Sequence, residues 1–254
     1  MSFTIVSLLT FFACNPMTPV EPPPAEVQAP VSVEKPVAVK KVITEEATVD
    51  TPSTNVAAEP PLTDDEKRAA LRDPTLNHRQ APDNYRVQFE TTKGSFIVGV
   101  TREWAPLGAD RFYHLVDIGF YNDTGFFRNV PGFVVQWGLN GDPAINMAWK
   151  NARIQDDPAK GHSNTEGTIV FATSGPNTRT SQLFINFKNN SNLDRMGFTP
   201  FGSVVEGMDV VNSLNNEYGQ TANQGRITME GNSYLKTNFP KMDFITNATV
   251  LPNL

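Results

Sequence analysis

The sequence predicts a mainly β domain over residues 84–254, built as a closed antiparallel barrel with helices capping its open ends. Short runs of β-branched and aromatic residues recur through this region, and such runs indicate strands. Two segments of the same region have the apolar spacing of core helices. By contrast, residues 15–62 contain no aromatic residue, so they cannot bury enough apolar surface to fold.

The overall composition excludes several classes of function. The chain has 254 residues and a net charge of -6, with no Lys/Arg cluster, so we expect no nucleic-acid partner. One cysteine, Cys14, excludes an internal disulfide and a cysteine-based zinc site. The three histidines are dispersed along the chain, and no metal or other cofactor is implied. We interpret His114, on a predicted helix, as a buried or surface histidine rather than a catalytic one.

The N-terminal residues 1–13, MSFTIVSLLTFFA, form an apolar run that resembles a secretory signal peptide. It is shorter than the roughly 18 residues of a membrane span. Cys14 follows directly, and FFAC resembles the lipobox of bacterial lipoproteins, although Phe11 and Phe12 replace its usual Leu and small residue. We predict lipidation of Cys14 and a location in the bacterial cell envelope, either periplasmic or anchored to a membrane by lipid. The alternatives are a free cysteine after a plain signal peptide and a misassigned start codon.

The next segment, residues 14–62, is rich in Pro, Glu, Ala, Val and Thr. Its proline content favours extended polyproline conformations and predicts a semi-stiff, disordered tether. With a lipid on Cys14, this tether would hold the folded domain away from the membrane.

Residues 63–83 are expected to form a lead-in with one short helix. Thr63 is an N-cap residue with Glu66 three positions later, which is the spacing of a capping box. From Tyr85 onward, apolar and polar residues alternate as in a half-buried strand. A turn at Lys93-Gly94 and the run SFIVGV then predict a β-hairpin.

The remaining elements follow from local patterns. WAPLGADRFYHLVDIGF predicts an amphipathic helix, with Pro106 in its first turn and Gly119 at its end. The runs VPGFVVQW, GTIVFAT, SQLFINF and FGSVV predict strands, and MDVVNSL predicts a second helix. The insertion GLNGDPAI after Trp137 has no readable function.

Three sequence blocks resemble the cyclophilin family of peptidyl-prolyl cis/trans isomerases. They are FFRNVPGFVVQWG from Phe126, SGPNTRTSQLFINF from Ser174 and LDRMGFTPFGSVVEGMDVV from Leu193. QGRITMEGNSYLKTNFPKMDFI resembles the C-terminal extension of a bacterial-type branch, so the resemblance covers residues 84–252. It implies a closed eight-stranded antiparallel barrel, with a helix at each open end, that catalyses rotation about Xaa-Pro bonds.

The chemistry of this rotation explains the role that the resemblance assigns to Arg128. Twisting the amide breaks its resonance against a barrier of about 18 to 20 kcal/mol. No covalent bond is made or broken, so no nucleophile or cofactor is needed. The proline nitrogen becomes pyramidal and gains a lone pair as the amide twists. A fixed cation that hydrogen-bonds to this nitrogen binds the twisted state better than either planar state, and we predict that Arg128 is this catalytic cation.

The resemblance also implies which residues bind the substrate. It assigns an apolar slot to the proline ring, glutamine side chains to the backbone of the substrate, and a strand end to the residue before proline. The substrate-binding residues so predicted are Phe133, Val134, Gln136, Ala172, Thr173, Gln182, Phe184, Leu193 and Phe198. The alternation in SQLFINF independently places Gln182 and Phe184 on one face of a strand.

Several positions depart from the best-known eukaryotic cyclophilins, among them Phe127, Asn192, Thr173, Val134 and Phe198. Phe127 stands where those proteins have His, and Asn192 where many have Trp. We expect Phe127 to make the edge of the groove more apolar.

We therefore predict a monomeric peptidyl-prolyl isomerase that assists protein folding in the bacterial envelope. Its partners would be proline-containing unfolded or extended polypeptides, and its membrane contact would be the lipid on Cys14. The alternative is a proline-peptide binding module or chaperone with low or incidental isomerase activity. A third interpretation, a structural barrel that presents the tether, requires Arg128 to pair with a carboxylate and point away from the groove.

Overall fold

The computed structural model describes residues 60–76 and 78–252. The predicted signal peptide of residues 1–13, Cys14 and the tether up to residue 59 lie outside the described residues. Within the described part of the chain, no helix has the length and apolarity needed to cross a membrane.

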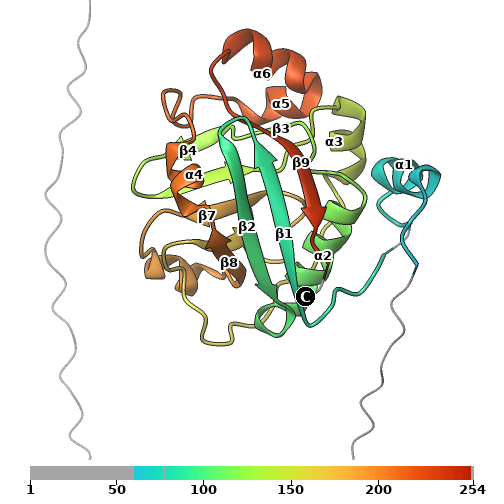
Figure 1. Ribbon diagram of the computed structural model, residues 1–254, viewed down its shortest axis with the longest axis vertical. Coiled ribbons are helices and arrows are strands. Elements are labelled where there is room, and N and C mark those ends of the chain that lie inside the picture. Colours follow the sequence, from blue (N-terminus) through green and yellow to red (C-terminus); the bar gives the residue numbers. More distant parts are fainter. Residues whose placement is uncertain (1–59, 77, 253–254) are drawn as a thin grey trace, which may run out of the picture. The chain divides into compact units, whose positions relative to one another are not determined.

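The centre of the domain is one sheet of nine strands in the order β3-β9-β1-β2-β8-β6-β7-β5-β4. Figure 1 shows the neighbouring strands β9, β1 and β2 of this sheet. Every neighbouring pair of strands is antiparallel. The strand bounds are Asn84–Thr91 (β1), Gly94–Thr101 (β2), Thr124–Gly125 (β3), Arg128–Val130 (β4), Val134–Trp137 (β5), Thr168–Phe171 (β6), Leu183–Asn186 (β7), Pro200–Glu206 (β8) and Phe244–Val250 (β9). The predicted mainly β, antiparallel class is confirmed.

The sheet is not the closed eight-stranded barrel that the sequence predicts. Strands β3 and β4 lie at its two ends and do not pair with each other. The Asn129 backbone N–H of β4 instead donates to the Gly219 carbonyl at 2.8 Å, and the Asn129 side chain donates to the Leu214 carbonyl at 2.9 Å. The loop of residues 214–219 therefore packs against β4 at Asn129. The sheet is therefore a curled half-barrel.

The predicted lead-in helix and hairpin are both present. Helix α1 spans Asp64–Arg72, and the Thr63 hydroxyl accepts from the Glu66 N–H while the Glu66 carboxylate accepts from the Thr63 N–H at 2.8 Å. This reciprocal pair is the predicted capping box. In the hairpin of β1 and β2, Thr91 pairs with Gly94, so the turn lies between them.

The helices are more numerous than the two expected in the core. Helices α2 (Pro106–Asp117) and α4 (Met208–Ser213) match the predictions, and α2 begins with its proline as expected. Three further helices are α3 (Pro143–Trp149), α5 (Gln224–Glu230) and α6 (Asn232–Asn238), and two 3-10 turns are η1 (Arg102–Trp104) and η2 (Ser191–Met196). Each missed α-helix has 7 residues, too few to reveal a helical period in sequence. Helix α3 is formed within the insertion after Trp137.

The apolar residues form three clusters. The largest fills the space between the concave sheet and α2 and includes Phe89, Phe112 and Trp137. A second cluster joins α5 and α6 to the sheet end through Ile227 and Leu235. The third lies on the outer face of β5, β6 and β7 and belongs to the site described below.

His114 is buried against the main core. The sequence had left open whether this histidine is buried or at the surface. It is 1% exposed, and its ring centroid is 4.9 Å from that of His78 and 5.9 Å from that of Trp149. Neither ring nitrogen has a hydrogen-bond partner in the described part of the chain. Burial, helped by the nearby His78 and two arginines, lowers the pKa of His114 to about 4, so this histidine is neutral at pH 7.

Candidate active site

The register of four strands aligns one row of side chains across the sheet. Arg128 of β4 pairs with Gln136 of β5, Gln136 pairs with Phe184 of β7, and Phe184 pairs with Val170 of β6. Side chains of directly opposite residues lie on the same face of a sheet. Arg128 therefore shares the outer face with an amide and two apolar side chains, while the intervening residue Val135 faces the core.

This outer face forms the floor of a groove with a volume of about 460 Å³. The structure brings all ten of the predicted site residues together along it. They are Arg128, Phe133, Val134, Gln136, Ala172, Thr173, Gln182, Phe184, Leu193 and Phe198. Their individual roles in binding and catalysis remain predictions.

One part of the groove, here named the apolar slot, is lined by Phe133, Val134, Phe184, Leu193 and Phe198. Val134, Phe184 and Leu193 are buried, and the rings of Phe184 and Phe198 meet edge to face with centroids 5.6 Å apart. A slot with such walls favours a compact apolar group, because binding removes apolar surface from water.

Arg128 lies at the edge of the apolar slot, with its guanidinium carbon 5.6 Å from the centre of the Phe133 ring. Its Nη1 donates to Gln136 Oε1 at 3.2 Å and its Nε donates to Gln220 Oε1 at 3.3 Å. Both acceptors are neutral amides, and no Asp or Glu lines the groove within the described residues. The third interpretation, which requires a carboxylate partner, is therefore wrong.

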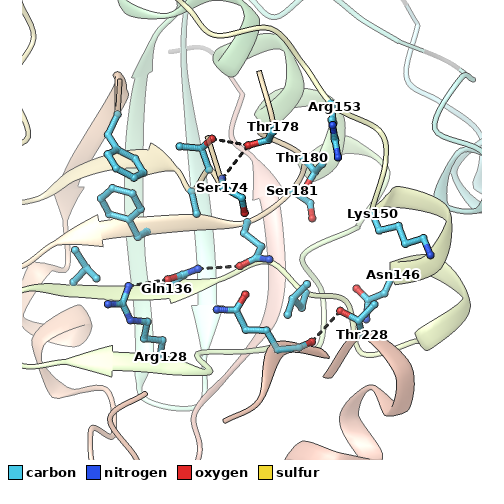
Figure 2. A pocket seen from close by; sticks show the side chains of 18 of the residues that line it. Arg128, Gln136, Asn146, Lys150, Arg153, Ser174, Thr178, Thr180, Ser181 and Thr228 are labelled. Carbon is cyan, nitrogen blue, oxygen red and sulfur yellow. Dashed lines mark hydrogen bonds between the residues drawn. The ribbon is translucent and has the colours of Figure 1, made fainter. Parts of the chain in front are cut away.

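The first of these acceptors, Gln136, belongs to a chain of amides (Figure 2). Gln136 is 6% exposed, and its Nε2 donates to Gln182 Oε1 at 2.9 Å. Because Gln136 accepts from Arg128 through one end of its amide and donates through the other, its orientation is fixed. This chain of amides restrains the Arg128 guanidinium from the floor of the groove. Gln220, which follows the loop of residues 214–219, restrains it from the other side.

A buried polar network supports the apolar slot from behind. Asn190 Nδ2 donates to the Phe133 carbonyl at 3.0 Å and to Asn186 Oδ1 at 2.8 Å. Asn164 Nδ2 donates to the Phe198 carbonyl at 2.8 Å. These three asparagines are at most 2% exposed, and they hold the backbone on both sides of the slot. These asparagines were not predicted from the sequence. The one sequence feature that could have indicated Asn186 is its place at the end of the apolar strand LFIN.

Asp194 completes this network on η2. It accepts from the Ser163 hydroxyl at 2.5 Å and from the Asn164 side chain at 2.7 Å. Partial burial raises the pKa of this carboxyl group, but the hydrogen bonds from Ser163 and Asn164 together outweigh it, and the net effect is a pKa below the usual value. The Asp194 carboxylate is therefore charged near neutrality and keeps accepting these bonds.

A buried ion pair holds the rim of the groove. Arg179 and Asp157 are 3% and 6% exposed, and Arg179 Nη1 donates to Asp157 Oδ2 at 3.0 Å. The same carboxylate accepts from the Leu107 and Gly108 backbone N–H groups, both at 2.9 Å. These groups lie in the first turn of α2, where a negative charge is favourable. The pair therefore ties α2 to the loop that carries Thr173.

The groove continues beyond the apolar slot into a part that the sequence analysis missed. Its further lining residues include Asn146 of α3, Lys150 and Arg153 just after α3, and Gln224 and Thr228 from α5. Figure 2 shows Lys150 and Arg153 on the opposite side of the groove from Arg128. No motif marked these positions, because α3 and α5 are brought to the groove by packing against each other.

The expectation for Phe127 is wrong. Phe127 is 2% exposed and packs in the second apolar cluster with Leu139 and Ile227, and it does not line the groove. The aromatic ring therefore serves to join α5 to the sheet end. Asn192 is exposed on η2 and also lies outside the groove lining.

The arrangement suits the binding of a peptide, because a cation, an apolar slot and side-chain amides lie along one groove. Within the described residues, no group of three or more His, Cys, Asp or Glu side chains could hold a metal ion. The fold and groove thus define a β-sheet enzyme domain of the rotamase type: a cation beside an apolar slot, with amides that fix a polar backbone.

Comparisons with known proteins identify the family. The family model described as cyclophilin type peptidyl-prolyl cis-trans isomerase/CLD matches residues 86–232. A peptidyl-prolyl cis-trans isomerase of Acinetobacter baylyi is 36% identical over 140 residues, covering 52% of this chain and 73% of that protein. Peptidyl-prolyl cis-trans isomerase B of Escherichia coli is 30% identical over 173 residues, covering 65% of this chain and 98% of that protein.

A solved structure supports the fold. The cyclophilin type peptidyl-prolyl cis-trans isomerase of Cryptosporidium parvum has a TM-score of 0.51 at 19% identity, covering 67% of this chain and 99% of that chain. The chain belongs to the cyclophilin type peptidyl-prolyl cis-trans isomerase family, and its activity is the isomerisation of Xaa-Pro bonds.

Proposed function

We propose that Arg128 catalyses this isomerisation while the apolar slot holds the proline ring of an unfolded or extended polypeptide. One observation carries the proposal: Arg128 borders the slot and is held by two neutral amide oxygens, from Gln136 and Gln220. Neutral acceptors restrain the guanidinium without cancelling its charge. Its remaining N–H groups are therefore available to the lone pair that develops on the proline nitrogen.

Arg128 can supply the larger part of the required reduction in the isomerisation barrier. An acceleration of about 10⁴ requires about 5.5 kcal/mol off the barrier. One preorganised donor in a site shielded from water contributes about 2.7 to 4 kcal/mol. The remainder would come from holding the peptide in a partly twisted geometry, with the ring in the slot and the backbone on Gln136 and Gln182.

The test is isomerisation of a short Ala-Pro peptide, measured by NMR exchange spectroscopy. We expect Arg128→Ala to lower kcat/KM about 10²- to 10³-fold, while the variant still folds and unfolds cooperatively in urea. Arg128→Lys keeps the charge but loses the planar fork that reaches Gln136 and Gln220 together, so it should recover only part of the loss. Full activity of Arg128→Ala would overturn the role of this arginine.

We further propose that the enzyme works in the bacterial envelope, anchored through a lipid on Cys14. The support is the apolar run of residues 1–13 and the cysteine that follows it. Expression of the full chain in a bacterium, followed by mass spectrometry of the mature N-terminus, tests this. A diacylated Cys14 supports the proposal, whereas an intact N-terminus with unmodified Cys14 contradicts both the anchor and the compartment.

The alternative of a binding module with incidental activity rested on Phe127, Asn192 and the long tether. Neither Phe127 nor Asn192 lines the groove, so two of its three motivations are gone.

A further inference from the structure

The groove extension, defined here as Asn146, Lys150, Arg153, Thr180, Gln224 and Thr228, has an unusual charge. Three of the residues that line the groove are cationic and, among the described residues, none is acidic. The chain as a whole has the opposite balance, with 21 Lys and Arg against 27 Asp and Glu. Two of the three cations, Lys150 and Arg153, belong to the extension.

Both cations are free to meet a ligand. Lys150 and Arg153 are exposed, and in the described part of the chain neither side chain forms an ion pair or a hydrogen bond. Other exposed cations of the domain do have acidic partners, such as Lys241, whose Nζ lies 2.9 Å from Glu217 Oε2. The two groove cations thus lack the internal partner that a structural role would supply.

The backbone that carries these cations is anchored on both sides. Before Lys150, Trp149 is 1% exposed and its Nε1 donates to the Leu71 carbonyl of α1 at 3.0 Å. After Arg153, the Ile154 backbone N–H donates to the Arg179 carbonyl at 2.9 Å. Asn146 also fixes α3, because its Oδ1 accepts from the Asn140 N–H at 2.7 Å. The cations therefore project from a preorganised segment, although their side chains remain flexible.

Strand β7 and the residues just before it run from the apolar slot to the groove extension. Phe184 lies in the slot, and two residues earlier the Gln182 carbonyl accepts from the Ala172 N–H at 2.9 Å. Two residues earlier again is Thr180, which lines the extension. Thr180 follows Arg179, whose carbonyl binds Ile154 next to Arg153. A ligand that extends from the apolar slot past Ala172 therefore approaches Lys150 and Arg153.

The direction of a bound peptide follows if the proline ring occupies the slot and the preceding residue pairs at Ala172 and Thr173, as the proposed function requires. Residues earlier in the peptide then run toward Lys150 and Arg153. At about 3.3 Å per extended residue, the path from Phe184 to Thr180 corresponds to about two to four peptide residues.

We propose that the groove extension is a specificity site for an acidic side chain two to four residues before the substrate proline, recognised by Lys150 and Arg153. Its chemistry is a carboxylate meeting two solvent-exposed cations. Such exposed pairs favour the bound state about 1.5- to 5-fold each. Together they should favour a Glu peptide over the matching Gln peptide about 2- to 25-fold in kcat/KM, and salt should weaken this ratio by screening.

The test compares peptides that share Ala-Pro and carry Glu, Gln or Lys at each of the second, third and fourth positions before proline. Isomerisation is measured by NMR exchange with the full chain. We expect kcat/KM to follow Glu above Gln above Lys at one or more of these positions. In the double variant Lys150→Gln with Arg153→Gln, the Glu-to-Gln ratio should fall to about one.

A matched control removes two positive charges elsewhere, with Lys93→Gln and Lys160→Gln, which do not line the groove. This variant should keep the Glu-to-Gln ratio and the activity on the Gln peptide. A ratio near one in the unaltered protein, or one that survives the groove substitutions, overturns the inference while leaving the isomerase role of Arg128 intact. If Arg128→Ala retains full activity on the Gln peptide, the proposed catalytic role fails instead.

Discussion

Replacing Gln136 with methionine tests whether the amide chain positions Arg128. Methionine has a similar length but cannot accept from Arg128 or donate to Gln182, so the substitution removes hydrogen bonds of 3.2 and 2.9 Å with little change in volume. A hydrogen bond to a charged group contributes about 1.5 to 3 kcal/mol, and one between neutral groups about 0.5 to 1.5 kcal/mol.

The lower ends of these ranges apply, because Arg128 and Gln182 border the groove and water can replace the lost partner. The stability loss is then about 2 kcal/mol. If most of the lost restraint on Arg128 appears in the transition state, about 2 kcal/mol corresponds to about a 30-fold fall in kcat/KM. Arg128 keeps its second restraint, Gln220 at 3.3 Å, so the loss should be smaller than in Arg128→Ala.

The assay is a double-mutant cycle on isomerisation kinetics, with urea unfolding measured in parallel. In the Arg128→Ala background, Gln136→Met should cost much less than its cost alone, because residues acting through one another are not additive. Gln88→Met on strand β1, far along the sheet order from β5, is the matched control and should keep full activity. An equal cost of Gln136→Met in both backgrounds would refute positioning of Arg128 by this amide.

Three further predictions concern stability. Arg179→Met leaves the buried Asp157 carboxylate without its cation, so the free energy of unfolding in urea should fall by about 3 to 5 kcal/mol; a loss below about 1 kcal/mol would show that the pair does not hold the rim. The unfolded chain protonates His114 near pH 6.5 and the folded chain only near pH 4, so stability should decrease by about 3 kcal/mol as pH falls through this window and level off below it. His114→Leu should remove that component, and an unchanged pH profile would contradict it. Asn190→Ala leaves the buried Asn186 Oδ1 without its donor and the Phe133 carbonyl with only the Phe187 N–H, so the free energy of unfolding should fall by about 1 to 3 kcal/mol and KM should rise more than kcat falls. An unchanged KM would show that Asn190 does not support the slot.

The strands of the groove could be predicted from local sequence because their pattern is self-contained. Alternation along a strand fixes which side chains share a face, so Gln182 and Phe184 were correctly placed together before their neighbours were known. The capping box at Thr63 is equally local. Resemblance to the family blocks then brought residues from β4, β5, β7, η2 and the loops between them to one site.

Other features depend on contacts between distant segments. Helix α3 has 7 residues, and it is fixed by buried bonds from Asn146 and Trp149 that no periodicity reveals. Phe127 also depends on contacts that the sequence does not reveal. Its position in the family pattern predicted a groove residue, yet packing against α5 places it in a separate core.

The sequence by itself determined the antiparallel β class, the order of the hairpin, α2 and α4, and ten of the residues that line the groove, because period-2 patterns, caps and signature blocks act over a few residues. Only the tertiary structure decided that the sheet stays open, with β3 and β4 at its two ends and the loop of residues 214–219 bonded to β4 at Asn129. It also decided that Gln136 and Gln220 hold Arg128, and that Lys150 and Arg153 border the same groove. The physical reason is that hydrogen bonds and charges between segments far apart in the chain leave no periodic trace in its order of residues.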